Sequence, residues 1–160
     1  MVRLMKKILS LMFLVLLLVV GCQKEEKEEF YLTYSGHNLY LNKEYSTDNY
    51  GQYTEMFENE SCAFGDRDVT FIYPDIEIET YSNLNSDKLI VYSIYFTGDD
   101  AKTNEGIKLF DEIADAIKVY GNDYELDGTK YTYNQGNTSL IFITENDIIK
   151  NIEYRVKNIG

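Results

Sequence analysis

Carboxylates are the most abundant side chains in this sequence that could perform acid–base chemistry. Glu77 and Glu79 alternate with Ile76 and Ile78, a β pattern that would place the two carboxyl groups on one strand face, about 7 Å apart. Such a pair could serve a glycosidase, in which one carboxyl group donates a proton and the other acts as base or nucleophile. A solvated strand face in an acidic protein is the simpler interpretation, so we expect no catalytic residue and no enzymatic activity.

Few other residues could take part in catalysis or metal binding. His37 is the sole histidine, and no G-x-S-x-G motif supplies a nucleophile for it. One histidine and one free cysteine cannot provide the three or four ligands of a zinc site. Asp99 and Asp100 are too short a pair for the six or more oxygens of a calcium site. Glycine-rich phosphate loops and dinucleotide fingerprints are also missing, so we expect no cofactor and no metal.

The N-terminal residues have the composition of a secretory signal. Residues 1–7 carry three positive charges and no acid, and residues 8–20 form an apolar run interrupted only by Ser10. A charged start, an apolar stretch and a small-residue end are typical of a signal peptide. As a helix the run would span ~20 Å, less than the ~30 Å hydrocarbon core of a bilayer, which disfavours a stable membrane-spanning helix.

The last four residues of this leader, Val19-Val20-Gly21-Cys22, resemble a bacterial lipobox, with Val in place of the usual Leu at the first position. The resemblance implies cleavage before Cys22 and attachment of fatty acyl chains such as palmitate to it. The protein would then be a lipoprotein, anchored to the cell membrane on its extracytoplasmic face. Residues 1–21 would be the signal peptide, residues 22–35 the lipidated Cys22 with a charged tether, and residues 36–160 a single domain.

Two features of the tether and the cysteines support this organisation. Residues 23–29 read QKEEKEE and contain nothing to bury, which favours a solvated tether over a charged helical extension. If Cys22 is acylated, Cys62 has no disulfide partner in the chain. We expect Cys62 to be a small buried side chain; a reactive thiol is the alternative.

Charge excludes one class of partner. The chain has a formal net charge of −12, and removal of the three basic residues of the leader leaves 12 basic and 27 acidic residues, a net charge of −15. Nucleic-acid binding needs Lys and Arg to neutralise phosphates, so we expect no nucleic-acid partner. Anionic lipids would also repel the mature chain, so the lipid on Cys22 is the expected membrane contact.

Alternation of β-branched and aromatic residues with polar residues predicts strands. The expected strands are residues 69–73, 76–81, 89–97, 130–133, 139–144 and 148–156. A helix is expected within residues 42–57, although Gly51 weakens it. A second helix is expected after Asp111 as N-cap, with Ile113, Ala114, Ile117 and Tyr120 as its apolar stripe and Gly121 at its end.

The second half of the chain repeats this order of elements. Leu39 and Leu41 correspond to Ile107 and Leu109, and a helix and three strands follow in each half. The repeat units would cover about residues 36–98 and 103–157. One helix on three strands is a small core, so the two units should share one six-stranded antiparallel sheet with both helices on one face, an α+β fold.

The residues 106–109, a helix, Tyr120-Gly121 and a tyrosine-rich meander resemble the repeat unit of the β-lactamase-inhibitor-protein-like and outer-membrane-assembly-lipoprotein-like fold. Residues 38–41 and 61–64 resemble uncharacterised Gram-positive lipoproteins of the same build. The resemblance covers roughly residues 36–156, and the first unit departs from it because its helix lacks the final Tyr-Gly. It implies binding of other proteins through an open sheet face, which fold similarity alone does not transfer to this chain.

The strand pattern indicates which side chains such a face would carry. If the isoleucines face the helices, the opposite side presents Glu77, Glu79, Tyr81, Ser93, Tyr95, Thr97, Asn151, Glu153 and Arg155. Rigid aromatic rings among polar groups are typical of recognition surfaces, but a register slip of one residue would invert the assignment. We therefore expect a non-enzymatic module that binds another envelope or extracellular protein. A small envelope enzyme that acts on glycans with a carboxylate pair, or a small-ligand sensor, is the alternative.

Overall fold

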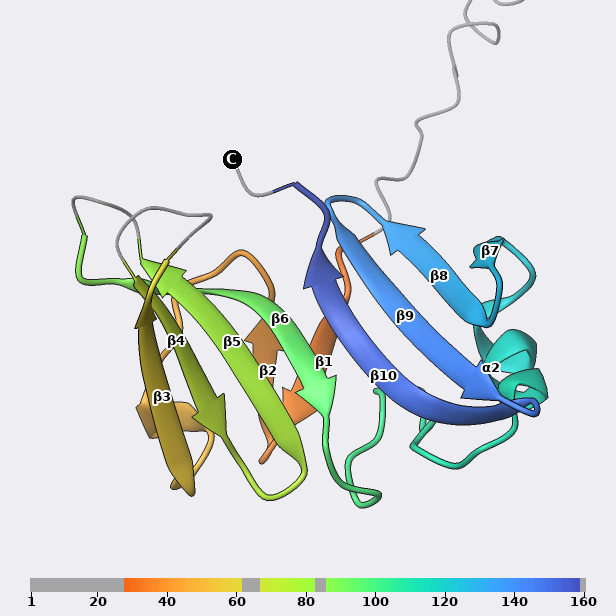
Figure 1. Ribbon diagram of the computed structural model, residues 1–160, viewed down its shortest axis with the longest axis horizontal. Coiled ribbons are helices and arrows are strands. Elements are labelled where there is room, and N and C mark those ends of the chain that lie inside the picture. Colours follow the sequence, from red (N-terminus) through yellow and green to blue (C-terminus); the bar gives the residue numbers. More distant parts are fainter. Residues whose placement is uncertain (1–27, 62–66, 83–85, 159–160) are drawn as a thin grey trace, which may run out of the picture.

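The computed structural model describes residues 28–61, 67–82 and 86–158 (Figure 1). The expected signal peptide, Cys22 and Cys62 lie outside these residues. The described chain forms a two-stranded sheet, β1–β2, and an eight-stranded sheet with the strand order β3-β4-β5-β6-β10-β9-β8-β7. Every neighbouring pair of strands is antiparallel.

The large sheet consists of two consecutive meanders of four strands. The small sheet contains β1 (Tyr31–Tyr34) and β2 (His37–Tyr40). The first meander contains β3 (Glu55–Glu60), β4 (Arg67–Ile72), β5 (Ile76–Ser82) and β6 (Leu89–Phe96). The second contains β7 (Tyr124–Asp127), β8 (Lys130–Gln135), β9 (Thr138–Glu145) and β10 (Ile148–Val156).

The meanders join through their last strands. Tyr95 pairs with Glu153, and Ser93 pairs with Arg155, so β6 and β10 run side by side at the centre of the sheet. An internal duplication would produce this order, but the duplication itself stays a prediction.

All six strands expected from the sequence are confirmed as β4, β5, β6, β8, β9 and β10. The expected α+β class is wrong, because the described chain is mostly β-structure and its only α-helix is α2 (Ile113–Tyr120). No α-helix forms within residues 42–57. The short 3₁₀ helix η1 (Thr47–Asn49) and the edge strand β3 occupy this stretch.

Tertiary pairing explains the missing first helix. The backbone N–H of Asn42 donates to the Val91 carbonyl, and that of Tyr45 donates to the Leu89 carbonyl, so this segment runs along β6. Gly51 adopts a φ of 82°, which a right-handed helix does not permit. The spacing of the apolar residues within residues 42–57 therefore reflects their contacts with the sheet and not one face of a helix.

Helix α2 differs from its prediction at one end. Its N-cap is Glu112 and not Asp111, because the Asp111 carboxylate accepts the Lys108 N–H at 2.9 Å. Ile113 and Ala116 are its buried residues, whereas Ala114 is exposed. Gly121 ends the helix with a φ of 85°, as expected, and its N–H donates to the Ile117 carbonyl at 2.8 Å.

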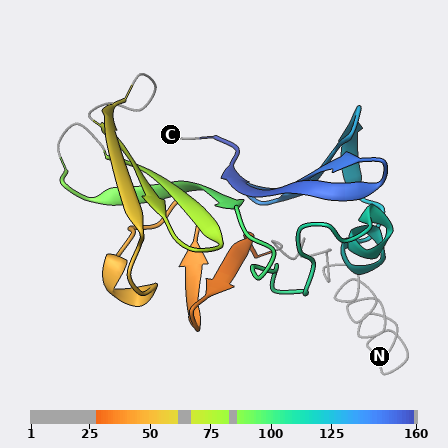
Figure 2. The ribbon, with the colours of Figure 1, turned by 60° about the horizontal axis from the view of Figure 1, so that its bottom comes forward.

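One side of the eight-stranded sheet is covered. Figure 2 shows β1, β2, η1 and the segment that contains α2 all lying on this side. Strand β1 falls within residues 22–35, which were expected to be a tether, and its Leu32 is 1% exposed. Phe30 is also held against the fold, because its N–H donates to Thr138 Oγ1 at 2.8 Å.

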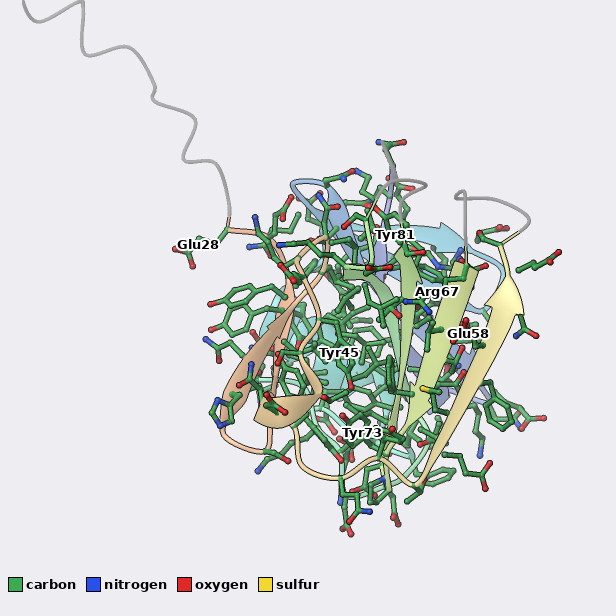
Figure 3. All side chains as sticks on the ribbon, turned by 90° about the vertical axis from the view of Figure 1, so that its left-hand side faces the viewer. Glu28, Tyr45, Glu58, Arg67, Tyr73 and Tyr81 are labelled. Atoms are coloured by element: carbon green, nitrogen blue, oxygen red, sulfur yellow. The ribbon has the colours of Figure 1, made fainter. Side chains whose placement is uncertain are left out.

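Tyrosines fill much of the covered side. In Figure 3, Tyr45 and Tyr73 lie in the layer between the sheet and the β1–β2 hairpin, and their hydroxyls are 2.6 Å apart. Burial raises the pKa of both hydroxyls above the usual value, so both stay protonated at neutral pH. No helix of the described residues has the length and hydropathy needed to cross a bilayer.

Candidate binding face

The side of the large sheet that points away from β1, β2 and α2 has no described element over it (Figure 2), and we call it the open face. Directly paired residues of antiparallel strands point to the same face. The register therefore defines a central row across all eight strands, which consists of Glu125, Thr132, Ile141, Glu153, Tyr95, Glu77, Ile72 and Glu55. At ~4.8 Å per strand, this row is ~34 Å long.

A second row lies beside the first. This adjacent row crosses seven strands, from β8 to β3, and consists of Asn134, Ser139, Arg155, Ser93, Glu79, Thr70 and Phe57. Phe57 is 52% exposed on the edge strand β3. The two rows together make one polar surface that crosses both meanders.

A hydrogen-bonded network orders the centre of this surface. The guanidinium of Arg155 forms an ion pair with Glu153 and donates from Nη2 to the Tyr95 hydroxyl at 2.8 Å. Ser93 Oγ donates to Glu153 Oε1 at 3.2 Å. The Glu153 side chain is 7% exposed and that of Arg155 is 47% exposed, so the carboxylate is held inside while the cation reaches the surface.

A second set of hydrogen bonds joins β7, β8 and β9. Asn134 Nδ2 donates to Glu125 Oε1 at 2.8 Å, and Ser139 Oγ donates to Asn134 Oδ1 at 2.8 Å. These contacts fix side chains of β7, β8 and β9 against each other. A face ordered in this way loses little side-chain entropy when a partner binds.

Glu79 carries the clearest electrostatic signal on the open face. Burial raises its pKa, and the carboxylates of Glu77 and Glu153 raise it further, while a hydrogen bond from Tyr92 and the charge of Arg155 lower it. The pKa of the Tyr92 hydroxyl is raised by burial and by the Glu79 charge, so Tyr92 remains a donor. At Glu79, the repulsion from Glu77 and Glu153 therefore outweighs the attraction to Arg155.

The charged side chains that the register places on the open face also show an excess of negative charge. Among the described residues of the open face, two are basic, Lys130 and Arg155. Eight are acidic: Glu55, Asp68, Glu77, Glu79, Glu125, Asp127, Glu145 and Glu153. A positively charged partner would relieve this excess of negative charge.

The register brings eight of the nine expected open-face residues to one side of the sheet, whereas Thr97 follows the end of β6 and is not part of the register. The eight are Glu77, Glu79, Tyr81, Ser93, Tyr95, Asn151, Glu153 and Arg155. They are not equally accessible: Tyr81 is 4% exposed and Glu153 is 6% exposed, whereas Arg155 is exposed. Tyr81 and Glu153 therefore support the surface from beneath, and the role of the whole set in binding stays a prediction.

Sequence reasoning missed the outer parts of the two rows. Glu55 and Phe57 lie on β3, which was not expected to be a strand, and Glu125 lies on β7, which was not expected either. Thr132 and Ser139 lie on expected strands, and their alternation could have assigned them to this face.

The open face has few of the features that a catalytic site or a metal site requires. Glu77 and Glu79 share the strand face expected for them, but neither lines the cavities of ≈180 Å³ and ≈470 Å³ among the described residues. No cluster of three or more His, Cys, Asp or Glu in the described part of the chain could hold a metal ion. His37 is exposed on β2, with its ring 6.5 Å from that of Tyr50.

Comparison of the chain with protein-family models, curated proteins and solved structures gives no match.

Proposed function

We propose that this chain is a lipid-anchored extracytoplasmic protein that binds a basic protein of the envelope through the open face, without catalysing a reaction. The observation that supports this most is the central row, in which carboxylates occur on β3, β5, β10 and β7 of one continuous sheet. Ordered side chains and uncompensated charge favour recognition of a complementary surface.

The expected anchor would keep the partner near the membrane. Phe30 is eight positions after Cys22, and a fully extended chain spans at most ~29 Å over that interval. Phe30 is fixed by Thr138, and the Glu29 carboxylate accepts the Asn137 N–H at 3.3 Å. With Cys22 acylated, the turn between β8 and β9 stays within that distance of the lipid, which favours a partner at the membrane surface.

Charge-reversal variants test the binding proposal. We would capture partners from detergent-solubilised envelope with the wild type, Glu77→Lys, Tyr95→Ala and Asp115→Lys. Asp115 is exposed on α2, away from the open face, so Asp115→Lys makes the same charge change elsewhere. We expect Glu77→Lys and Tyr95→Ala to lose a basic partner that the wild type and Asp115→Lys retain, in a salt-sensitive manner. Unchanged capture by both open-face variants would refute the proposal.

The anchor has a separate test. Cys22→Ser should leave the leader uncleaved or release the protein from membranes, as measured by fractionation and by the mass of the intact protein. A Cys22→Ser protein that is processed and retained like the wild type would show that Cys22 is not the anchor.

A glycan-cleaving enzyme is the second candidate, because the pKa of Glu79 is raised beside Glu77, as a general acid requires. Release of reducing sugar from envelope glycans by the wild type, and its loss in Glu79→Gln, would favour this enzyme over the binding module.

A further inference from the structure

The covered side contains a small cavity of ≈180 Å³ where the chain enters the fold. Three segments build it: residues 28–31 before and in β1, residues 104–105 with the end of α2, and strands β8 and β10 of the second meander. This volume is similar to that of a ~150 Å³ engineered cavity that accepts benzene, and it exceeds the ~30 Å³ that one water occupies. The cavity therefore suits a small molecule or a single side chain.

Aromatic rings form the inner wall of the cavity. Tyr154 is 1% exposed and Tyr133 is 4% exposed, and both line it together with Phe30 and Tyr120. The Phe30 ring lies 6.4 Å from that of Tyr120 and 6.3 Å from that of Tyr154, both edge to face. The Tyr133 hydroxyl donates to the Gly121 carbonyl at 3.0 Å, and burial raises its pKa to about 12.

Carboxylates line the outer part. Glu28, Glu29, Glu105 and Asp123 all belong to the lining and are all exposed, and the lining contains no Lys, Arg or His. Glu105 accepts a hydrogen bond from the Tyr120 hydroxyl. Within the described residues, the site thus combines buried rings with exposed negative charge, and no cation lines it.

The walls are fixed in place without a ligand. Asn104 Oδ1 accepts the Thr33 N–H at 2.8 Å, and Asn104 Nδ2 donates to the Tyr31 carbonyl at 3.0 Å. These bonds attach the 104–105 segment to β1. Binding to a rigid site costs little conformational entropy, because its walls are already ordered.

We propose that this cavity binds the ammonium group of a small organic cation. Aromatic faces attract such cations through the ring quadrupole, and aromatic cages recognise quaternary ammonium ligands. The lining carboxylates add Coulomb attraction for the same charge. A metal ion fits less well, because the described carboxylates nowhere cluster tightly enough to chelate one. The ammonium group could belong to a free amine or to a lysine side chain of another protein. Of the residues in the two open-face rows, only Asn134 lines this cavity, so this inference does not depend on binding at the open face.

Calorimetric titration of the full chain in detergent tests the inference with three probes. Choline represents a free amine, N-acetyl-lysine methylamide represents a lysine side chain, and 3,3-dimethylbutan-1-ol is the neutral isostere of choline. We expect saturable binding of at least one cation, and at least about tenfold weaker binding of the neutral isostere. Saturation by choline would identify a free amine as the ligand, and saturation by the lysine analogue alone would identify a protein side chain.

Two variants locate the binding in the cavity. Glu105→Gln and Asp123→Asn each remove one lining charge, and each should weaken cation binding about three- to tenfold. Asp123 is exposed, so Asp123→Asn should fold like the wild type even if Glu105→Gln loosens Tyr120. Asp115→Asn on α2 lies outside the lining and should bind like the wild type. Absence of saturable binding for both cations, equal affinity for the neutral isostere, or equal losses in Asp115→Asn and Asp123→Asn would overturn the proposal.

Discussion

Ile152 and Glu153 are neighbours on β10, yet they face opposite sides of the same sheet. Ile152 is fully buried among apolar side chains of the covered side. Glu153 is almost as buried, but it lies on the open face between Arg155 and Ser93. Burial on the covered side therefore serves packing, whereas burial on the open face serves to hold polar groups in a fixed arrangement.

Tyrosines show the same difference. On the covered side their hydroxyls bond to each other, to the main chain or to a carboxylate, as in the Tyr45–Tyr73 pair and the bonds from Tyr133 to Gly121 and from Tyr120 to Glu105. On the open face, the Tyr95 hydroxyl accepts from Arg155 and its ring is half-buried. The comparison indicates that the covered face packs the core, while the open face carries hydrogen-bonded polar groups.

The largest expected effect is a difference in stability between variants with substitutions on the two faces. Ile152→Ala should lower the free energy of unfolding by about 2–5 kcal/mol, because it leaves a cavity in a closed core. Ile143→Ala on β9 changes the same residue type on the open face, where the side chain is 37% exposed, and should cost less than about 1 kcal/mol. Urea unfolding curves would measure both, and equal losses would contradict the assignment of faces.

The next effect tests whether the open face is held by its network. Arg155→Met leaves the Glu153 carboxylate buried with only Ser93 as a partner, which should cost about 1–3 kcal/mol at neutral pH. Adding Glu153→Gln should recover part of that loss in a double-mutant cycle. Lys88→Met is the control. Both side chains of the Lys88–Glu44 ion pair are exposed, so the pair should contribute at most about 0.5 kcal/mol to the free energy of unfolding. Independent, additive losses for Arg155 and Glu153 would show that they do not act together.

Alkaline pH should act mainly on the covered face. Burial raises the pKa of Tyr45 and Tyr154 above the value of 10.0 that applies in the unfolded chain. A group with a raised folded pKa contributes stability that is complete below the unfolded pKa and is lost as the pH rises through the folded pKa. Stability should therefore fall above about pH 10, and tyrosinate absorbance should rise together with unfolding. Early titration of these tyrosines in a folded protein would contradict their burial.

The smallest effect concerns Glu79 on the open face. Its folded pKa lies above 4.5, so its contribution to stability is present below the unfolded pKa and is lost as the pH rises through the folded pKa. Glu79→Gln should flatten the stability profile just above pH 4.5, where the wild type loses this contribution. An unchanged slope in Glu79→Gln would contradict the raised pKa of this carboxyl group.

Local patterns in the sequence predicted part of this structure. Alternation of Ile and Glu in β5 assigned Ile76 and Glu77 to opposite faces, because side chains in a strand alternate with a period of two. The strand β3 could not be recognised in this way, since its residues are exposed throughout. The helix expected around Tyr45 failed because long-range pairing with β6 outweighed local spacing.

The rows and the cavity depend on contacts that no local pattern encodes. Tyr95 and Glu153 are 58 positions apart in the chain, and their pairing alone joins the two halves of the central row. The cavity brings Phe30 against Tyr120 and Tyr154, which are separated by most of the domain. Only the register and the packing of the folded chain could reveal either site.

Site-specific photo-crosslinking in living cells tests the central claim most directly. A photoreactive phenylalanine analogue would replace Phe57, 52% exposed on the open face, or Phe110, 60% exposed in the segment that covers the other side. The account predicts that position 57 crosslinks to a basic envelope protein, that Glu77→Lys abolishes this crosslink, and that position 110 does not form it. Crosslinking of the same protein from both positions, or a crosslink from position 57 that Glu77→Lys leaves intact, would contradict it.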